Sequence, residues 1–137
     1  MIYNVLAKVR EILEDDALIT TVTDGDLFEV DLSKQTIFPL AHFMLGNITQ
    51  SDYTISFELS VMFADIIEED DSNYRDVWNR TLTSARLFVE TLRRGDLDNF
   101  EIDGDVVHEP FRDRFTNKLG GFMTTVNIIV PNETAIC

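Results

Sequence analysis

The longest regular pattern in the chain is an alternation of apolar and polar side chains over residues 53–65. Successive side chains of a β-strand point to opposite faces, so this alternation predicts a long strand with one apolar face. A second alternation, over residues 122–130, predicts another long strand, which follows Gly120-Gly121 and ends at Pro131. Both strands suit a sheet with one face on a core and the other against water or another subunit.

Two segments have the apolar spacing of amphipathic helices. The first covers residues 2–13 and is expected to end near Asp15-Asp16, where acidic residues oppose the helix dipole. The second covers residues 74–94, with Ser72-Asn73 as its N-cap candidate and Gly95 as its stop. Its expected apolar stripe comprises Trp78, Leu82, Ala85, Val89 and Leu92, with Phe88 beside it.

Shorter strands and turns are predicted between these elements. A turn is expected at residues 23–26, followed by strands at residues 28–32 and 37–45, the second of which ends at Gly46-Asn47. An Asp-Gly pair favours a tight hairpin turn, so residues 100–107 are expected to form a hairpin around theirs.

The predicted order is helix, two or three strands, long helix, hairpin and long strand, within a single domain over residues 1–137. Helices do not alternate with strands, as they do in parallel βαβ folds. The pattern therefore predicts an α+β fold, in which two α-helices pack on one face of an antiparallel β-sheet. A length of 137 residues, of which 45% are hydrophobic, is sufficient for one core.

The charge balance narrows the classes of function. The 25 Asp and Glu residues exceed the 11 Lys and Arg residues, which gives a formal net charge of -14. Sequence-independent nucleic-acid binding requires Lys and Arg to neutralise phosphates. A charge of this sign repels polyanions, so the chain as a whole is not expected to clamp DNA or RNA.

The sequence predicts that the protein is made and kept in a cytoplasm. Residues 1–10 lack the long apolar core of a signal peptide. No stretch approaches the roughly 18 apolar residues of a membrane span, so no membrane partner is expected. The single cysteine, Cys137, permits no disulfide within the chain.

No residue pattern predicts a catalytic, cofactor or metal site. His42 and His108 have no second histidine or cysteine at the spacing of a zinc site, and His42 is interpreted as a packed or interface residue. The acidic run over residues 65–71 lacks the glycine and the final glutamate of a calcium loop. The chain has neither a phosphate-binding loop nor a nucleophile elbow. We therefore expect no enzymatic activity.

Two segments are candidate contact regions for other subunits. In residues 111–118 arginine and phenylalanine are interleaved around Asp113, and both residue types are enriched at interfaces. An ordinary surface loop and a nucleic-acid contact are the alternatives for this segment. In residues 66–73 an acidic run precedes the long helix. Carboxylates at this position are stabilised by the positive, N-terminal end of the helix dipole. The candidate interface residues are Phe111, Arg112, Arg114, Phe115, Glu68, Glu69, Asp70 and Asp71.

The layout resembles that of the tail terminator and tail-completion (neck) proteins of tailed bacteriophages. The resemblance covers most of the chain and follows the order of the elements more than signature residues. It is carried by the N-terminal helix, Phe38-Pro39-Leu40-Ala41-His42-Phe43, the strand over residues 55–63 with Ala64-Asp65 after it, Trp78-Asn79 with Leu82, Leu87 and Leu92, Leu119-Gly120-Gly121-Phe122, Val130-Pro131-Asn132 and Cys137.

This resemblance implies a structural protein of the virion, with a tail-terminator-like fold and no catalytic residues. Members of the family form rings, often hexamers, that cap the tail tube and join it to the head, whereas connector rings follow the twelve-fold symmetry of the portal. The implied partners are copies of the same chain in a ring of six or twelve, other neck, tail-tube or portal proteins, and DNA that passes without specific binding. The implied location is the virion, with the host cytoplasm during assembly.

Two other classes of protein stay open. An α+β domain can bind a small molecule, which requires a deep pocket with convergent polar groups. An acidic protein can also act as an inhibitor by mimicking DNA, which requires its carboxylates to form a ribbon. Here Lys and Arg are scattered among the acidic residues.

Overall fold

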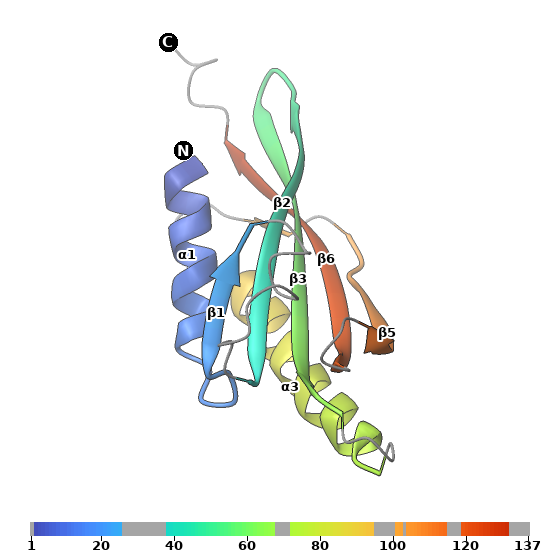
Figure 1. The fold of residues 1–137 in the computed structure, drawn as a ribbon. Coiled ribbons are helices and arrows are strands. Elements are labelled where there is room, and N and C mark those ends of the chain that lie inside the picture. The colour runs from blue at the N-terminus through green and yellow to red at the C-terminus, as the bar shows by residue number, and fades with distance from the viewer. Residues whose placement is uncertain are drawn as a thin grey trace.

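The computed structural model of the chain describes residues 2–25, 38–67, 72–94, 101–102, 104–114 and 119–131. In these residues two helices lie on one face of a six-stranded sheet (Figure 1). The predicted α+β fold is confirmed. The elements, in chain order, are α1 Ile2–Glu14, β1 Thr21–Asp24, β2 Leu40–Gln50, β3 Thr54–Ile66, α3 Tyr74–Arg93, β4 Glu101–Ile102, β5 Val107–Arg114 and β6 Leu119–Pro131.

The two predicted long strands, β3 and β6, are neighbours at the centre of the sheet. The strand order is β1-β2-β3-β6, and β4 and β5 both pair with the far edge of β6. β3 and β6 pair antiparallel along their whole length, so the prediction of two long alternating strands is confirmed. Gly120 and Gly121 lie inside β6, not ahead of it.

The first strand, β1, differs from the prediction. Residues 21–24 form a strand where a turn was expected from residue 23, and this strand runs parallel to β2. The sheet is therefore mixed, although its other pairings are antiparallel. Four residues are too few to show an alternation of apolar and polar side chains. Their partners in β2 also lie outside the local sequence, as Thr21 opposite Leu40 shows. The strand predicted at residues 28–32 lies outside the described residues.

The predicted end of β2 and the predicted hairpin at residues 100–107 are both wrong. β2 continues past Gly46-Asn47 to Gln50, through a register shift between Leu45 and Ile48 that has the character of a β-bulge. β4 and β5 pair with β6 and not with each other. Gly104, at a φ of 67°, therefore lies within an interrupted edge along β6 rather than in a hairpin turn.

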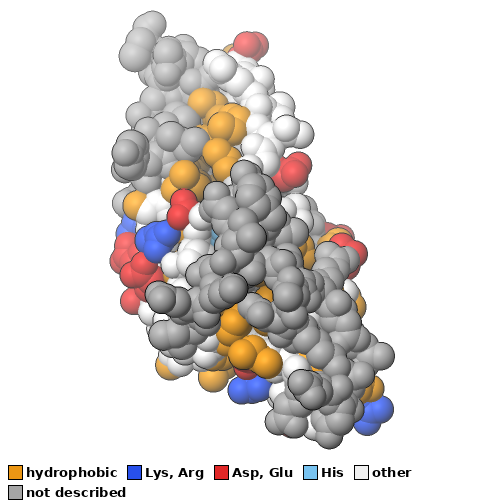
Figure 2. Space-filling view, in the orientation of Figure 1, with side chains coloured by type: hydrophobic (Ala, Val, Ile, Leu, Met, Phe, Trp, Pro, Cys, Tyr) orange, Lys and Arg blue, Asp and Glu red, His pale blue; other side chains and the backbone are white. Residues whose placement is uncertain are grey.

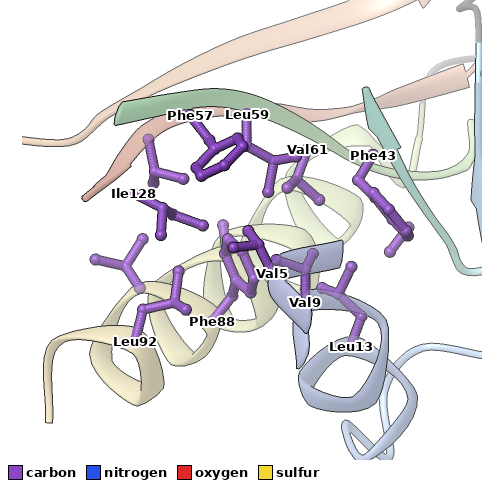
Figure 3. Packing of buried hydrophobic residues seen from close by; sticks show 14 of the residues in the cluster. Val5, Val9, Leu13, Phe43, Phe57, Leu59, Val61, Phe88, Leu92 and Ile128 are labelled. Carbon is purple, nitrogen blue, oxygen red and sulfur yellow. The ribbon is translucent and has the colours of Figure 1, made fainter. Parts of the chain in front are cut away.

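The main core lies between the helices and the sheet (Figure 3). Val5, Val9 and Leu13 are four residues apart, so they form one inward stripe on α1. Phe88 of α3 meets Phe63 of β3 with their ring centroids 6.1 Å apart. The cluster comprises Val5, Val9, Leu13, Ala41, Phe43, Phe57, Leu59, Val61, Phe63, Ala85, Phe88, Val89, Leu92, Val126, Ile128 and Val130.

The long helix α3 spans Tyr74–Arg93, within one residue of the prediction. Its inward face is rotated relative to the predicted stripe, so that Trp78 and Leu82 are half-buried at the margin. Asn73 holds the N-cap position without a side-chain cap bond; its Nδ2 donates instead to the Ile66 carbonyl at 3.1 Å. The buried residues of α3 are Val77, Thr81, Ser84, Ala85, Phe88, Val89 and Leu92.

A second, smaller cluster lies on the face of the sheet opposite to the helices. Side chains alternate along β3, so Met62 and Ala64 point away from Phe63 and from the helices, and both are fully buried. This end of the sheet is thus buried on both faces. The cluster comprises Leu40, Met62, Ala64, Phe111 and Leu119.

Candidate functional site

The two predicted contact regions are anchored at the same end of the sheet. Leu119, at the start of β6, pairs with Ile66 at the end of β3 and with Arg114 at the end of β5. The described ends of the two segments, Ile66 in the first and Arg114 and Leu119 in the second, are therefore brought together. Five of the candidate interface residues lie outside the described residues: Glu68, Glu69, Asp70, Asp71 and Phe115.

The remaining candidates, Phe111, Arg112 and Arg114, belong to β5 and not to a loop. The side chain of Phe111 is 6% exposed and packs in the second cluster, so within one domain it is a core residue. Arg112 and Arg114 are described in their backbone alone. Their role in an interface stays a prediction.

Trp78 connects α3 to the strands at this end of the sheet. Its indole Nε1–H donates to the Phe111 carbonyl at 3.0 Å. Its ring also meets Tyr74 edge-on, with centroids 5.3 Å apart, and Phe122 at 6.3 Å. Sequence analysis assigned Trp78 only to an apolar stripe. The indole N–H was the available signal, because a buried tryptophan usually finds an acceptor.

The first residue of the acidic run, Asp65, has a structural partner. Its carboxylate lies 3.2 Å from the Arg80 guanidinium of α3 and also accepts the Ile66 N–H at 2.8 Å. The Asp65 side chain is 13% exposed, but that of Arg80 is 48% exposed. Solvent therefore screens the ion pair, which contributes at most about 1 kcal/mol.

Both histidines have structural hydrogen bonds. His42 is buried; its Nε2 lies 3.1 Å from the Gly25 carbonyl and its Nδ1 lies 2.7 Å from the Thr23 hydroxyl. Because a carbonyl only accepts, Nε2 donates to it, and the ring holds the end of β1 against β2. The interpretation of His42 as a packed residue is confirmed. His108 Nδ1 lies 2.8 Å from the Thr124 hydroxyl, and burial, followed by the Arg86 charge, lowers the pKa of His108.

Two features of the described residues bear on a metal or ligand site. Within the described ranges, no group of three or more His, Cys, Asp or Glu could hold a metal ion. A cavity of about 130 Å³ opens between α1 and α3, lined by residues that include Asp15, Asp16, Ser84 and Leu87. Pockets for small molecules are typically about 300–1,000 Å³. Neither described helix is long and apolar enough to cross a bilayer.

β2 and β3 continue past the end of β1 and are joined by a hairpin loop, and β6 accompanies β3 as far as Thr54, opposite Pro131 (Figure 1). We call residues 45–54 the β2–β3 arm. It closes at a two-residue loop, where the Ser51 N–H donates to the Thr54 carbonyl at 2.8 Å. Its exposed apolar side chains include Leu45, Ile48 and Tyr53, which is 83% exposed. The arm was not predicted, because Gly46-Asn47 was interpreted as the end of the first of these strands.

Uncharged strands cover much of this part of the molecule. β2 and β6 contain no Asp, Glu, Lys or Arg, although such residues make up 26% of the chain. On the sheet face opposite to the helices, the hydroxyls of Ser60 and Thr125 lie 3.3 Å apart. In Figure 2 the upper part of the described surface is mainly white and orange, with red side chains at its margins. The charged residues of the chain therefore all lie outside β2 and β6.

No family model and no curated protein matches this chain. A function for the chain therefore rests on its own fold, charge and surface.

Proposed function

We propose that this chain is a structural protein of a tailed bacteriophage, which assembles into a ring at the neck or tail through which DNA passes. The observation that carries the proposal is the β2–β3 arm, which has exposed apolar side chains and a single acidic residue, Asp52, in a chain of net charge -14. Exposed apolar side chains at the surface of a sheet are suited to contact with another subunit. The order of the elements, which resembles that of tail terminator and neck proteins, supports the same function.

The net charge suits a conduit for DNA. Like charges repel, so acidic residues on the lumen of a ring let DNA slide without binding. Contacts between subunits require surfaces that bring few like charges together, and β2 and β6 supply such surfaces. A head-to-tail contact between subunits closes into a ring when the rotation between neighbours fits.

The alternatives have less support from the described residues. The cavity between α1 and α3, at about 130 Å³, is smaller than a typical ligand pocket. A DNA mimic requires a continuous ribbon of carboxylates, and the uncharged strands β2 and β6 interrupt such a ribbon. The proposal includes no catalytic role.

The mass of the purified protein in solution tests the ring. We expect light scattering over a concentration series to reveal a species of six or twelve times the 15.7 kDa chain mass. Electron micrographs of the same fraction should show closed rings with a central opening. Six copies would match a tail terminator, and twelve would match a portal connector. A mass that stays below six copies at every concentration contradicts a ring formed by this chain alone.

Binding of DNA tests the conduit separately. Labelled duplex DNA at physiological salt is expected to show no change in fluorescence anisotropy when the protein is added. Binding that weakens steeply as salt rises would indicate a basic surface that neutralises phosphates, and it would contradict passage without specific binding.

A further inference from the structure

The described sheet ends in edges that differ in their protection. An unpaired strand edge exposes backbone N–H and C=O groups that can pair with another chain, so most proteins block their edges. β1 is only four residues long. The Arg10 guanidinium of α1 donates to the Val22 carbonyl at 3.2 Å and to the Asp24 carboxylate at 3.0 Å. The edge at β1 is therefore short and partly covered.

The edge formed by β4 and β5 is blunted in a different way. It is interrupted between Ile102 and Val107, and its register shifts again between Phe111 and Arg114. Pro110 has no N–H to donate, and β5 contains four charged residues, Glu109, Arg112, Asp113 and Arg114. A regular ladder along this edge is therefore excluded.

Among the described residues, the outer half of β2 has one irregularity, the register shift between Leu45 and Ile48, and no strand that covers it. β1 pairs with β2 from Leu40 to Phe43, and the described residues beyond that point pair with β3 alone. We call residues 44–50 the β2 open edge. It contains neither a charged residue nor a proline, and Leu45 and Ile48 are 39% and 49% exposed beside it.

The hydrogen-bond pattern of the arm shows which backbone groups face outward. The Ser51 N–H bonds to the Thr54 carbonyl, so these two residues form a hydrogen-bonded pair. In an antiparallel ladder such pairs alternate with non-bonded pairs. Gln50 and Ile55 are thus a non-bonded pair. Two residues further along the ladder, Ile48 and Phe57 are also a non-bonded pair. The N–H and C=O groups of Ile48 and Gln50 therefore point away from β3.

We propose that the β2 open edge pairs antiparallel with the same edge of a second copy of this chain, which joins the two sheets across a two-fold axis. Among the described strands this edge has the longest run without a charge, a proline or an outer neighbour, and its residues 48–50, beyond the register shift, pair regularly with β3, so a second copy offers no better strand than its own. The two strands carry no charge, so like charges do not meet although each copy carries -14. Isologous contacts of this kind are self-complementary. The pair is a state of the free chain and does not rest on the ring.

Hydrogen exchange measured by NMR distinguishes this pairing from other contacts. At high concentration we expect a species of twice the 15.7 kDa chain mass that dissociates on dilution. The amides of Ile48 and Gln50 should exchange slowly in the pair and rapidly in the dilute chain. The amide of Thr49, which already faces Ser56 of β3 in a bonded pair, should change little.

Two variants and one control locate the contact. Ile48→Lys places like charges near each other across the axis, and Gln50→Pro removes an outward donor without breaking the ladder with β3. Each should weaken the pair by at least about tenfold. Val107→Lys, at a residue 69% exposed on the opposite edge, is the matched control and should leave the pair unchanged.

Each outcome decides the proposal. A pair that survives both edge variants, a pair that only Val107→Lys dissociates, or a monomer at every concentration would overturn it. A six- or twelve-copy species unaffected by the edge variants would support the ring and overturn this pairing. A two-copy species lost in both edge variants, without any larger species, would support this pairing and contradict the ring.

Discussion

Replacement of Gly121 with alanine should destabilise the protein much more than the same change at Gly104. Both glycines have positive φ angles, +153° and +67°. At Gly104 an added Cβ has no atom within 4 Å. At Gly121 it would overlap the carbonyl oxygen of Phe63 and lie 2.9 Å from the carbonyl carbon. The two positions therefore separate backbone strain from steric overlap.

The magnitudes follow from these surroundings. Alanine in a left-handed conformation costs about 1–2 kcal/mol, and the lower entropy of the unfolded chain offsets part of this, so Gly104→Ala should lose about 1 kcal/mol. At Gly121 the unfavourable φ and the overlap each cost about 1–3 kcal/mol. The overlapped group is the backbone of β3, which is held between β2 and β6 and cannot turn aside. The expected loss is about 2–6 kcal/mol, against a typical domain stability of about 5–15 kcal/mol.

Urea unfolding followed by circular dichroism measures both losses. The midpoints should fall in the order wild type, Gly104→Ala, Gly121→Ala, with similar slopes if each variant unfolds in a two-state transition. Equal losses in the two variants, or a larger loss at Gly104, would refute the close approach of β6 to the carbonyl of Phe63.

Three further predictions concern single side chains. Phe88→Ala should lower the free energy of unfolding by about 3–5 kcal/mol, because it leaves a cavity in the main core; a loss below about 1 kcal/mol in urea unfolding would contradict that packing. Trp78→Phe keeps an aromatic ring but removes the donor to the Phe111 carbonyl, so chemical unfolding should show a loss of about 1 kcal/mol. Burial and Arg86 lower the pKa of His108 in the folded protein, so the folded state binds its proton less readily than the unfolded state does. Wild type should therefore lose more stability than His108→Gln as the pH falls through 6.5 and below, and identical pH profiles would contradict this.

Elements with a strong local pattern were predictable from the sequence. β3 and β6 alternate over many residues, and the helices carry four-residue apolar spacing, so their type and approximate bounds follow from local periodicity. β1 was missed because its four residues pair in parallel with a strand remote in the chain. At Gly104 the Asp-Gly signal did mark a positive φ, but the chain there continues along β6 instead of forming a hairpin. Which strands pair is decided by contacts across the sheet, and no local signal records these contacts.

The candidate site was less predictable than the fold, for a physical reason. An aromatic residue such as Phe111 suits an interface and a core equally well, and only the register of β5 on β6 buries it. The arm depends on a β-bulge past Gly46, where the sequence indicates a stop. The sequence shows that β2 and β6 contain no charged residue. That these two strands lie close together, with only β3 between them, is known from the strand order alone.

The central position of β6 governs when the protein can fold during its synthesis. β3 pairs along its whole length with a strand that follows about 65 residues later, as Ser60 and Thr125 illustrate. Until β6 leaves the ribosome, the side of β3 that pairs with β6 is unoccupied and its apolar neighbours on β6 are missing. Contacts between such distant residues form slowly, and exposed strands aggregate in the meantime. Nascent chains released before residue 119 are therefore expected to be insoluble. β3 is protected only after the ribosome has synthesised β6.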